Sequence, residues 1–484
     1  MQDEPRDPGS MSAPPALQWG GRFDAPPDPA LLAFGSSLDE DLVLASFDLR
    51  TSLAHVAALE GGGILDGAQA AELRAALGQV AREIADGSFA AFARSSRAED
   101  IHGAIDARVR ELASEAGGSL HAGRSRNDQV ATTLALYVRD RAARGARATH
   151  VILRELLAQA RTELRAGTPL AATTHWQPAQ PVLLAFWLAA LAEAFLRGLA
   201  RFEQVAAEAA RDCPLGSGAC SGSSLPLDRE AAAKLLGFAR PSRNALDAVG
   251  DRDLALDLVQ AVARALGTAS RACEELVVWA TPAYGYLRLG DAASTGSSSM
   301  PQKRNPDPFE LIRAAAKRSA GELAAALGTV AGIGLSYHRD LQETKSIVLA
   351  ASERGLAALE AFGRALAAVQ WRREALAARA GEGFVVATDL ADALIARGIS
   401  AREAHAQVGA LVAQAERAAR SLDASDLATL AERTGLGAPL VAPLDPTASI
   451  AAKRTSGSTA PREIERTLAA IEAVLARAEG KSAG

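Results

Sequence analysis

The feature that most constrains the fold is an uninterrupted apolar run of eleven residues, from Val182 to Ala192, which ends at Glu193. A helix that carries apolar side chains on every face cannot lie on the surface of a water-soluble protein. It must be surrounded by other helices, in a large bundle or at a subunit interface. We expect both arrangements at once in this chain.

Composition supports a helical fold throughout the chain. Apolar residues make up 49% of the 484 residues, but aromatic residues only 4%, and Ala and Leu supply most of the apolar content. Both residues favour helix. The four-residue spacing of Leu254, Leu258, Val262 and Leu266 places one apolar stripe on a helix, which we expect to open with residues 251–253. The sequence therefore predicts an all-α protein.

Breaks in the helical pattern divide the chain into sections. We predict a disordered tail at residues 1–18, which is rich in Pro, Asp and Ser, and a helical domain at residues 19–123. Residues 124–375 form a long-helix bundle in this division, and residues 376–484 a small helical domain. A chain of this length is too long for a single ordinary core, so several domains are expected.

Charge, cysteine content and apolar runs exclude several classes of protein. The formal net charge of −5 is unsuited to wrapping nucleic acid. The three cysteines include no CxxC pair, so we expect reduced thiols rather than disulfides or zinc ligands. The beginning of the chain has no apolar segment typical of a signal peptide. No apolar run approaches the roughly 20 residues of a membrane span. We expect a cytoplasmic protein that binds neither nucleic acid nor membrane.

The most informative motif spans Gly296–Pro306 and reads Gly-Ser-Ser-Ser-Met-Pro-Gln-Lys-Arg-Asn-Pro. Its Gly and Ser residues supply backbone N–H groups and hydroxyls that suit anion binding. Lys303 adds a positive charge, and Asn305 adds a neutral donor. A mobile Ser/Gly linker is the alternative, but a linker does not require the Met-Pro-x-Lys-x-Asn-Pro sequence that follows.

A second motif surrounds His175 in the segment Thr173–Pro181. Imidazole is the side chain best suited to moving protons near neutral pH. The neighbours of His175 are polar, whereas a structural histidine more often lies on an apolar face. On this motif alone, a catalytic and a structural histidine are equally good interpretations.

Two further segments carry groups that can hold carboxylates. Residues 120–129 contain Arg124, Ser125, Arg126 and Asn127, and arginines bind carboxylates through paired hydrogen bonds. Residues 337–345 contain Tyr337, Gln342 and Lys345, which can converge on an acidic ligand. The alternatives are a charged helix N-terminus for the first segment and a solvated charged face for the second.

Motifs for nucleotides, metals and nucleophilic serine hydrolysis are absent from the sequence. It contains no GxxxxGK[ST], no correctly spaced GxGxxG, no HExxH and no GxSxG. We therefore expect no metal and no cofactor.

Taken together, the four segments resemble the fumarase/aspartase superfamily of lyases, whose signature loop reads Gly-Ser-Ser-x-Met-Pro-x-Lys-x-Asn-Pro. Within this superfamily the chain resembles the argininosuccinate lyases. The motifs typical of that family are Trp19–Phe23 (Trp-Gly-Gly-Arg-Phe), Gly123–Gln129 (Gly-Arg-Ser-Arg-Asn-Asp-Gln) and Gln302 in the signature loop. The resemblance runs from about residue 19 to about residue 466.

The resemblance implies a carbon–nitrogen lyase, an amidine lyase, of arginine biosynthesis. Such an enzyme splits argininosuccinate reversibly into L-arginine and fumarate by anti elimination, without a cofactor. It also implies a homotetramer around a central helical bundle, a three-domain chain, and active sites built from three subunits.

The resemblance further assigns site residues. Ser297 takes the role of general base and His175 that of proton donor to the leaving group, oriented by Glu310, although which of the two is acid and which is base stays open. Lys303 and Asn305 stabilise the negative charge that develops. The positions that hold substrate are Ser37, Asp41, Arg124, Ser125, Asn127, Thr174, Arg252, Tyr337, Gln342 and Lys345.

Three positions depart from the family pattern. Pro178 stands where the family more often has Arg, Ser299 where it has Leu, and Ala122 where it has Thr. None removes an assigned catalytic group, so we expect activity, but not necessarily the kinetics typical of the family. Two other functions remain open: a sister lyase acting on adenylosuccinate, aspartate or malate, and a non-catalytic, crystallin-like structural protein.

Overall fold

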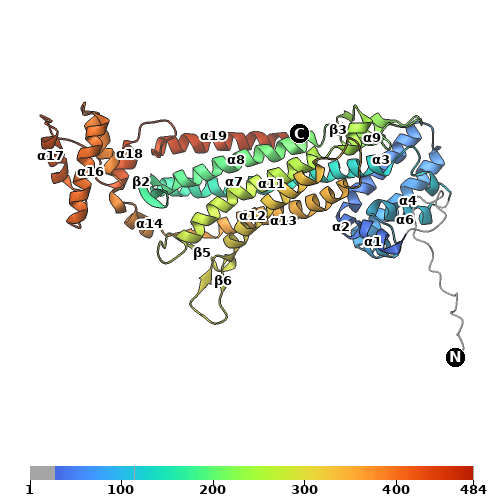
Figure 1. Ribbon diagram of the computed structural model, residues 1–484, viewed down its shortest axis with the longest axis horizontal. Coiled ribbons are helices and arrows are strands. Elements are labelled where there is room, and N and C mark those ends of the chain that lie inside the picture. Colours follow the sequence, from blue (N-terminus) through green and yellow to red (C-terminus); the bar gives the residue numbers. More distant parts are fainter. Residues whose placement is uncertain (1–27, 114, 483–484) are drawn as a thin grey trace. The chain divides into compact units, whose positions relative to one another are not determined.

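The computed structural model describes residues 28–113 and 115–482, and within them helices dominate (Figure 1). The all-α prediction is confirmed, because the strands form only four two-stranded pairs among these residues. The predicted tail at residues 1–18 and the Trp19–Phe23 motif lie outside the described residues.

Five helices of at least 24 residues form the framework: α7 (Arg126–Ala166), α8 (Leu184–Glu208), α11 (Asp253–Trp279), α12 (Asp307–Val330) and α13 (Leu341–Ala367). Before them come α1 (Pro29–Gly35), α2 (Leu38–Asp41), η1 (Leu42–Leu44), α3 (Ala45–Gly61), α4 (Gly67–Asp86), α5 (Phe89–Ser95), α6 (Ile101–Leu112) and η2 (Gly117–Ser119). Among them or after them come α9 (Arg229–Leu236), α10 (Ala245–Gly250), η3 (Asp291–Ala293), α14 (Arg373–Arg379), η4 (Glu382–Phe384), α15 (Ala387–Ile395), α16 (Ala401–Arg417), α17 (Ala424–Arg433), α18 (Pro446–Ala452) and α19 (Pro461–Ser482).

The strands serve mainly to close loops. The antiparallel pairs are β1 (Pro169–Thr174) with β2 (Gln177–Leu183), β5 (Leu287–Leu289) with β8 (Val369–Trp371), and β6 (Thr295–Gly296) with β7 (Arg304–Asn305). The pair β3 (Asp212–Cys213) with β4 (Arg240–Pro241) is parallel.

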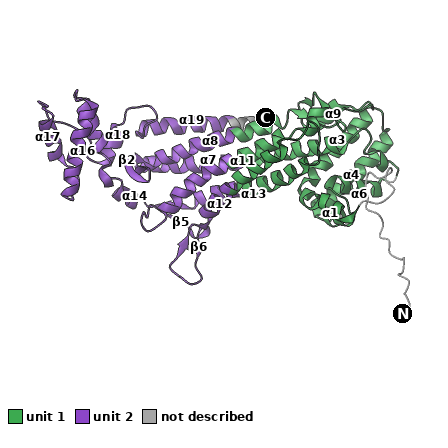
Figure 2. Cartoon of the chain, viewed as in Figure 1, with its two compact units in different colours: residues 1–146, 201–263, 318–356 green, residues 147–200, 264–317, 357–484 purple. Residues whose placement is uncertain are grey.

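The chain divides into two compact units, each assembled from separate stretches of sequence (Figure 2). Unit 1 comprises residues 1–146, 201–263 and 318–356, and unit 2 comprises residues 147–200, 264–317 and 357–484. The division predicted from the sequence, by contrast, follows the order of the chain, and it stays a prediction.

The core of unit 1 includes a packed layer of α3, α4 and α6. Residues such as Leu59, Leu73, Leu77 and Ile105 on these helices are at most 1% exposed. Helix α4 starts with a capping box between Asp66 and Gln69 and ends at a left-handed Gly87, so its length is encoded locally.

Unit 2 contains an aromatic cluster of Trp187, Trp279 and Trp371, whose ring centroids lie 4.9 to 6.2 Å apart. Its C-terminal helices α15, α16 and α17 enclose a separate apolar cluster that includes Leu394 and Leu430, both fully buried. Burial of apolar surface in each of these groups favours the packing of its neighbouring helices.

The apolar run Val182–Ala192 begins as strand and continues as helix. Val182 and Leu183 belong to β2, and α8 begins at Leu184. The change occurs because the backbone N–H of Leu183 bonds to the Thr459 side chain and that of Leu184 bonds to the carbonyl of Thr168. Similarly, the helix that we expected to open at residues 251–253 begins at Asp253.

By length and composition alone, one segment of the described chain, residues 29–61, is long and apolar enough to cross a membrane. However, 67% of its most apolar window is buried within the protein. It is not one continuous helix, because α1, α2, η1 and α3 divide it. Burial of this kind is typical of a core helix.

Helices α7 and α8 approach closely at Gly145, which generates a stability prediction. A β-carbon at Gly145 would lie 2.4 Å from the Phe202 ring, which is fully buried. We expect Gly145→Ala to lower the free energy of unfolding by about 1–3 kcal/mol through overpacking, despite the better helix propensity of Ala. Urea denaturation measures the change.

The matched control is Gly78→Ala in α4, where a β-carbon meets nothing within 4 Å. This substitution should be neutral, or stabilising by about 0.5–1 kcal/mol. Equal stability of the two variants would contradict the close approach of α7 and α8.

Candidate active site

The signature loop is closed by a short hairpin in unit 2. Strands β6 and β7 pair Thr295 with Asn305 and Gly296 with Arg304, so residues 297–303 form the loop between them. The Thr295 hydroxyl donates to Asp307 at 2.5 Å, and Arg304 pairs with Asp291. Both contacts fix the base of the loop, and the figure shows the loop extending beyond β6 (Figure 1).

Ser297 lies at the start of this loop with its oxygen turned toward backbone donors. Its Oγ accepts from the N–H of Met300 at 3.2 Å and from the N–H of Ser299 at 3.4 Å. The Ser299 hydroxyl lies 3.4 Å from the same oxygen. Fixed N–H dipoles of this kind favour a negatively charged oxygen, so the turn is suited to a serine that gives up its proton.

The positive and polar groups of the loop stay accessible. Lys303 is exposed and Asn305 is half-buried. The side chain of Lys303 makes no hydrogen bond or ion pair with the residues that the structure describes. Its charge is therefore available to an anionic ligand beside Ser297.

His175 occupies the tip of the hairpin formed by β1 and β2. Thr174 pairs with Gln177, and His175 and Trp176 between them have φ values of 54° and 61°. Two left-handed residues in a two-residue turn match the twist of a hairpin, but they are costly for side chains of this size. The turn presents Thr174 and His175 to solvent.

The hairpin is supported by the C-terminal part of unit 2, where β1 contacts α14 and β2 contacts α18 and η4. Pro178, which stands where the family more often has Arg, lies in β2 near these contacts. A β-carbon on Gly383, which has a φ of 74°, would lie 3.4 Å from the Pro178 ring. Pro178 therefore packs closely against the backbone that follows α14.

Glu310 lies in the first turns of α12 and is exposed. Its nearest cation is Arg313, one turn further along the helix, at 3.9 Å. Within the described part of the chain, no hydrogen bond joins Glu310 to His175, although the resemblance assigns it to orient that histidine. Within one chain, Glu310 therefore does not orient His175 through a direct hydrogen bond.

A compact charged group lies in unit 1. The Lys345 ammonium is 2.6 and 2.8 Å from the two carboxylate oxygens of Asp41, and it donates to Ser37 at 3.1 Å. The Ser37 hydroxyl also donates to Asp41, at 2.7 Å. All three side chains are buried, so the pair is shielded from water and its geometry is well defined.

Further predicted binding residues surround this group. The amide of Gln342 donates to the carbonyl of Gly35 at 3.1 Å. Burial raises the pKa of Tyr337, although the charges of Arg339 and Arg252 oppose the rise. Burial also lowers the pKa of Arg252, which is 4% exposed and whose Nε lacks a hydrogen-bond partner among the described residues.

The start of α7 carries the residues predicted from the 120–129 segment. Arg124 points into the core and donates to Ser52 at 3.1 Å. Ser125 and Asn127 are partly exposed, and the amide of Asn127 donates to the carbonyl of Ala219 at 2.9 Å.

Asp100, which the sequence did not identify as a candidate, pairs with Arg126 of the 120–129 segment. Arg126 lies 3.1 Å from the carboxylate of Asp100. Although burial opposes the change, the charges of Arg126, His102 and Lys345 lower the pKa of Asp100. Arg126 therefore faces Asp100, whereas Arg124 is buried. Arg126 stood in the quoted motif, but nothing in the sequence singled out Asp100.

Asp128 connects this segment to the loop that follows Cys213. One carboxylate oxygen accepts from the N–H groups of Gly216 and Gly218 at 2.9 and 2.8 Å, and the other accepts from Ser125 at 3.0 Å. Gly216 and Gly218 have φ values of 85° and 60°, which glycine adopts most readily. Asp128 thus fixes the backbone around Ser125 and Asn127.

Comparison with known proteins gives consistent relatives. The chain matches the family described as Lyase over residues 21–321 and the family described as Argininosuccinate lyase C-terminal over residues 384–451. Argininosuccinate lyase of Acidothermus cellulolyticus is 42% identical, with 97% of this chain and 96% of that protein covered. Argininosuccinate lyase of Deinococcus deserti is 40% identical, with 93% and 96% covered.

Solved structures with the same fold include EDDS lyase in complex with formate, with 26% identity, a TM-score of 0.79, and 93% of this chain and 90% of that chain covered. Class II fumarase from Schistosoma mansoni is 15% identical with a TM-score of 0.67, covering 82% and 87%. The fumarase match concerns the fold alone.

The burial of Asp128 generates a pH prediction. Burial raises the pKa of Asp128 to about 6, although the amide donors and Arg124 oppose the rise. Because the folded carboxyl holds its proton more tightly than the unfolded one, its stability contribution is present below about pH 4 and is lost as pH rises through 6. The loss amounts to about 3 kcal/mol at most.

Urea denaturation of wild type and Asp128→Asn between pH 4 and 7 measures this contribution. The stability of wild type relative to the variant should fall as pH rises, whereas the exposed control Asp392→Asn should show no such trend. A relative stability that rises with pH would contradict the assignment.

Proposed function

Because the chain belongs to the argininosuccinate lyase family of the fumarase/aspartase superfamily, we propose that it cleaves argininosuccinate into L-arginine and fumarate by anti elimination. The reaction is reversible and belongs to arginine biosynthesis in the cytoplasm. The observation that carries the proposal is the environment of Ser297, whose oxygen accepts two backbone N–H groups in a loop that also holds Lys303.

The chemistry requires such an environment. A proton on the carbon next to a carboxylate is only weakly acidic, so the charge that develops when it leaves must meet fixed positive groups. Ser297 removes this proton, and Lys303 and Asn305 bind the carboxylate on which the charge accumulates. His175 gives a proton to the departing guanidino nitrogen, and the carbon–nitrogen bond breaks as the double bond of fumarate forms.

A serine hydroxyl is a weak base unless its pKa is lowered, and each pKa unit requires about 1.4 kcal/mol. The N–H groups of Ser299 and Met300 supply part of that stabilisation. A full charge nearby, such as that of Lys303, supplies more, particularly when the substrate displaces water.

The buried group in unit 1 suits the amino-acid end of the substrate. Lys345 and Arg252 are positive groups for a carboxylate, and Asp41 is a negative group for an ammonium ion. Ser125, Asn127, Tyr337 and Gln342 add neutral donors and acceptors, and Thr174 adds another beside His175. The buried Arg124 contributes by supporting the segment that carries Ser125 and Asn127.

Exposure of the catalytic groups supports assembly into a homotetramer with shared active sites. His175, Lys303 and Glu310 are exposed in one chain, whereas a lyase must exclude water while the charge develops. In α8, Phe186 is only partly buried and Ala190 is exposed, so this apolar helix also has surface left to cover. Other copies of the chain would enclose both the helix and the catalytic groups.

Two substitutions test the catalytic roles. We expect Ser297→Ala and His175→Asn each to lower kcat by about 1,000-fold or more, because each removes a proton-transfer group. Fumarate absorbance in the ultraviolet follows the reaction, and sedimentation confirms the assembly. The matched control Ser298→Ala should keep near-normal rates.

Mixing the two inactive variants after reversible dissociation tests whether the sites are shared. Some mixed tetramers then hold a site with both Ser297 and His175 intact, and activity should return. Mixtures that assemble but stay inactive would contradict shared sites.

Incubating fumarate with arginine, ammonia, water or AMP separates the proposed reaction from those of sister lyases. Fumarate should disappear only with arginine. Success with another partner and failure with arginine would end the assignment, and a tetramer inert in both directions would favour a structural protein.

The departure at position 299 predicts a shifted pH profile. The Ser299 hydroxyl, 3.4 Å from the Ser297 oxygen, can stabilise that oxygen as it becomes charged. Removing it in Ser299→Ala should raise the pKa of Ser297 and move the acidic limb of kcat/KM upward by about 0.5–1 pH unit, equivalent to about 1 kcal/mol. An unchanged profile, as expected for Ser298→Ala, would show that Ser299 has no such role.

A further inference from the structure

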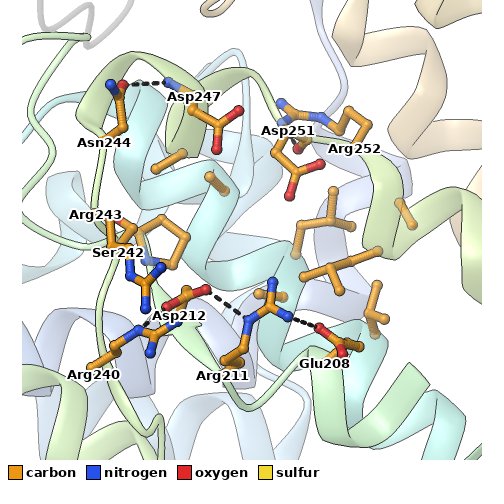
Figure 3. Close-up of a pocket in the computed structure, with 18 residues that line it drawn as sticks. Glu208, Arg211, Asp212, Arg240, Ser242, Arg243, Asn244, Asp247, Asp251 and Arg252 are labelled. Carbon is orange, nitrogen blue, oxygen red and sulfur yellow. Dashed lines mark hydrogen bonds and ion pairs between the residues drawn. The ribbon is translucent and has the colours of Figure 1, made fainter. Parts of the chain in front are cut away.

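A pocket of about 430 Å³ lies in unit 1 where α7, the end of α8, α10 and the start of α11 meet (Figure 3). This volume is in the range of small-molecule sites. Of the residues assigned to the substrate, only Arg252 also lines this pocket. The other polar residues that line it are Glu208, Arg211, Asp212, Arg240, Ser242, Arg243, Asn244, Asp247 and Asp251.

One side of the pocket is apolar and suits a hydrocarbon chain. Leu134 and Val138 of α7 and Leu254 of α11 line it together with four alanines. Leu134 is 4% exposed and Val138 is fully buried, so this surface is fixed by the core of unit 1.

A second side is basic. Asp212 accepts from Arg211 at 2.9 Å and from Arg240 at 2.7 Å, and Arg211 also pairs with Glu208. Arg243 lines the same pocket, and its side chain has no ion pair with the residues that the structure describes. The basic side therefore has one guanidinium more than its own carboxylates neutralise.

The opposite side is acidic. Figure 3 shows the carboxylates of Asp247 and Asp251 across the pocket from Arg211 and Arg240. Neither carboxylate forms an ion pair with a described residue. Burial raises the pKa of Asp251, and the neighbouring charges of Asp253 and Asp247 add to the rise. A cation placed here would therefore relieve the repulsion between these carboxylates.

We propose that this pocket binds a small α-amino acid with a cationic side chain, of the chemistry of free L-arginine. Its guanidinium lies against Asp247 and Asp251, its aliphatic stem crosses Leu134 and Leu254, and its carboxylate meets Arg243. The inference rests on the proposed function only in choosing arginine as the first probe, because charge and shape define the pocket independently.

Arg252 couples the pocket to the substrate-binding residues, because it belongs to both. It follows Asp251 in the chain and donates to the Asp251 carbonyl at 2.7 Å, and its charge also acts on Tyr337. A cation held by Asp251 therefore changes the electrostatic surroundings of Arg252. Bound amino acid should raise or lower the KM for argininosuccinate in a way that direct competition does not explain.

Calorimetric titration of the full-length protein with L-arginine tests the proposal. Wild type should show two classes of site per chain, one at the substrate-binding residues and one at the pocket. Asp247→Asn and Arg243→Gln should each weaken the pocket class by at least tenfold. Both variants change exposed side chains and should leave folding and arginine-free initial rates unchanged. Glu416→Gln, an exposed carboxylate of α16, is the matched control and should bind as wild type.

Two related ligands test the two ends of the pocket. L-citrulline keeps the shape of arginine but is neutral at the side chain, and agmatine lacks the carboxylate. Both should bind the pocket class at least tenfold more weakly than arginine, and L-lysine should bind with intermediate affinity. Equal affinity for citrulline would overturn the cation assignment, and a single class of site in wild type would overturn the proposal.

The Lys345→Met variant separates the two hypotheses. It should weaken the class of site at the substrate-binding residues and leave the pocket class intact. A protein that fails to cleave argininosuccinate but still binds arginine in a class lost in Asp247→Asn would refute the proposed function alone. A protein that cleaves argininosuccinate but shows no such class would refute the pocket alone.

Discussion

The carboxylate of Asp128 is the interaction on which the substrate-binding side of unit 1 depends. It accepts backbone N–H groups from Ser125 and from Gly216 and Gly218, so it joins the start of α7 to the loop after Cys213. Because a buried carboxylate must be satisfied by donors, this arrangement leaves the loop little freedom. Asn127 then bonds to Ala219 of the same loop, and a proposed substrate contact is held in place.

A different principle governs the catalytic residues. Ser297 and His175 lie on hairpin loops in unit 2, and strand pairing fixes each loop at its base. Helices of the bundle provide rigid supports, while the loops keep their reactive groups accessible. The left-handed backbone conformation of His175 and Trp176 raises the local conformational energy of the turn that exposes His175. In the proposed tetramer, neighbouring copies would complete and shield these groups.

The pocket lined by Asp247 and Arg243 has no counterpart in the sequence motifs. Its walls come from residues 131–138 and 208–255, which are separated by at least 70 positions in the sequence, and its charges are ordinary surface residues when each is considered alone. Only their arrangement around an apolar floor separates a positive end from a negative end. Arg252 belongs both to this pocket and to the residues assigned to the substrate, which makes it the natural point of coupling.

The sequence alone determined the helical class, the family and the composition of the signature loop, because periodicity and short motifs are local properties. It also indicated that most of Val182–Ala192 is buried, although the first two of these residues proved to be strand and Ala190 is exposed in one chain. Only the tertiary structure distinguished the buried Arg124 from Arg126, which faces Asp100, since neighbouring side chains at a helix start point in different directions. The ion pair of Asp41 with Lys345, 304 residues apart, likewise depends on packing that no local pattern records.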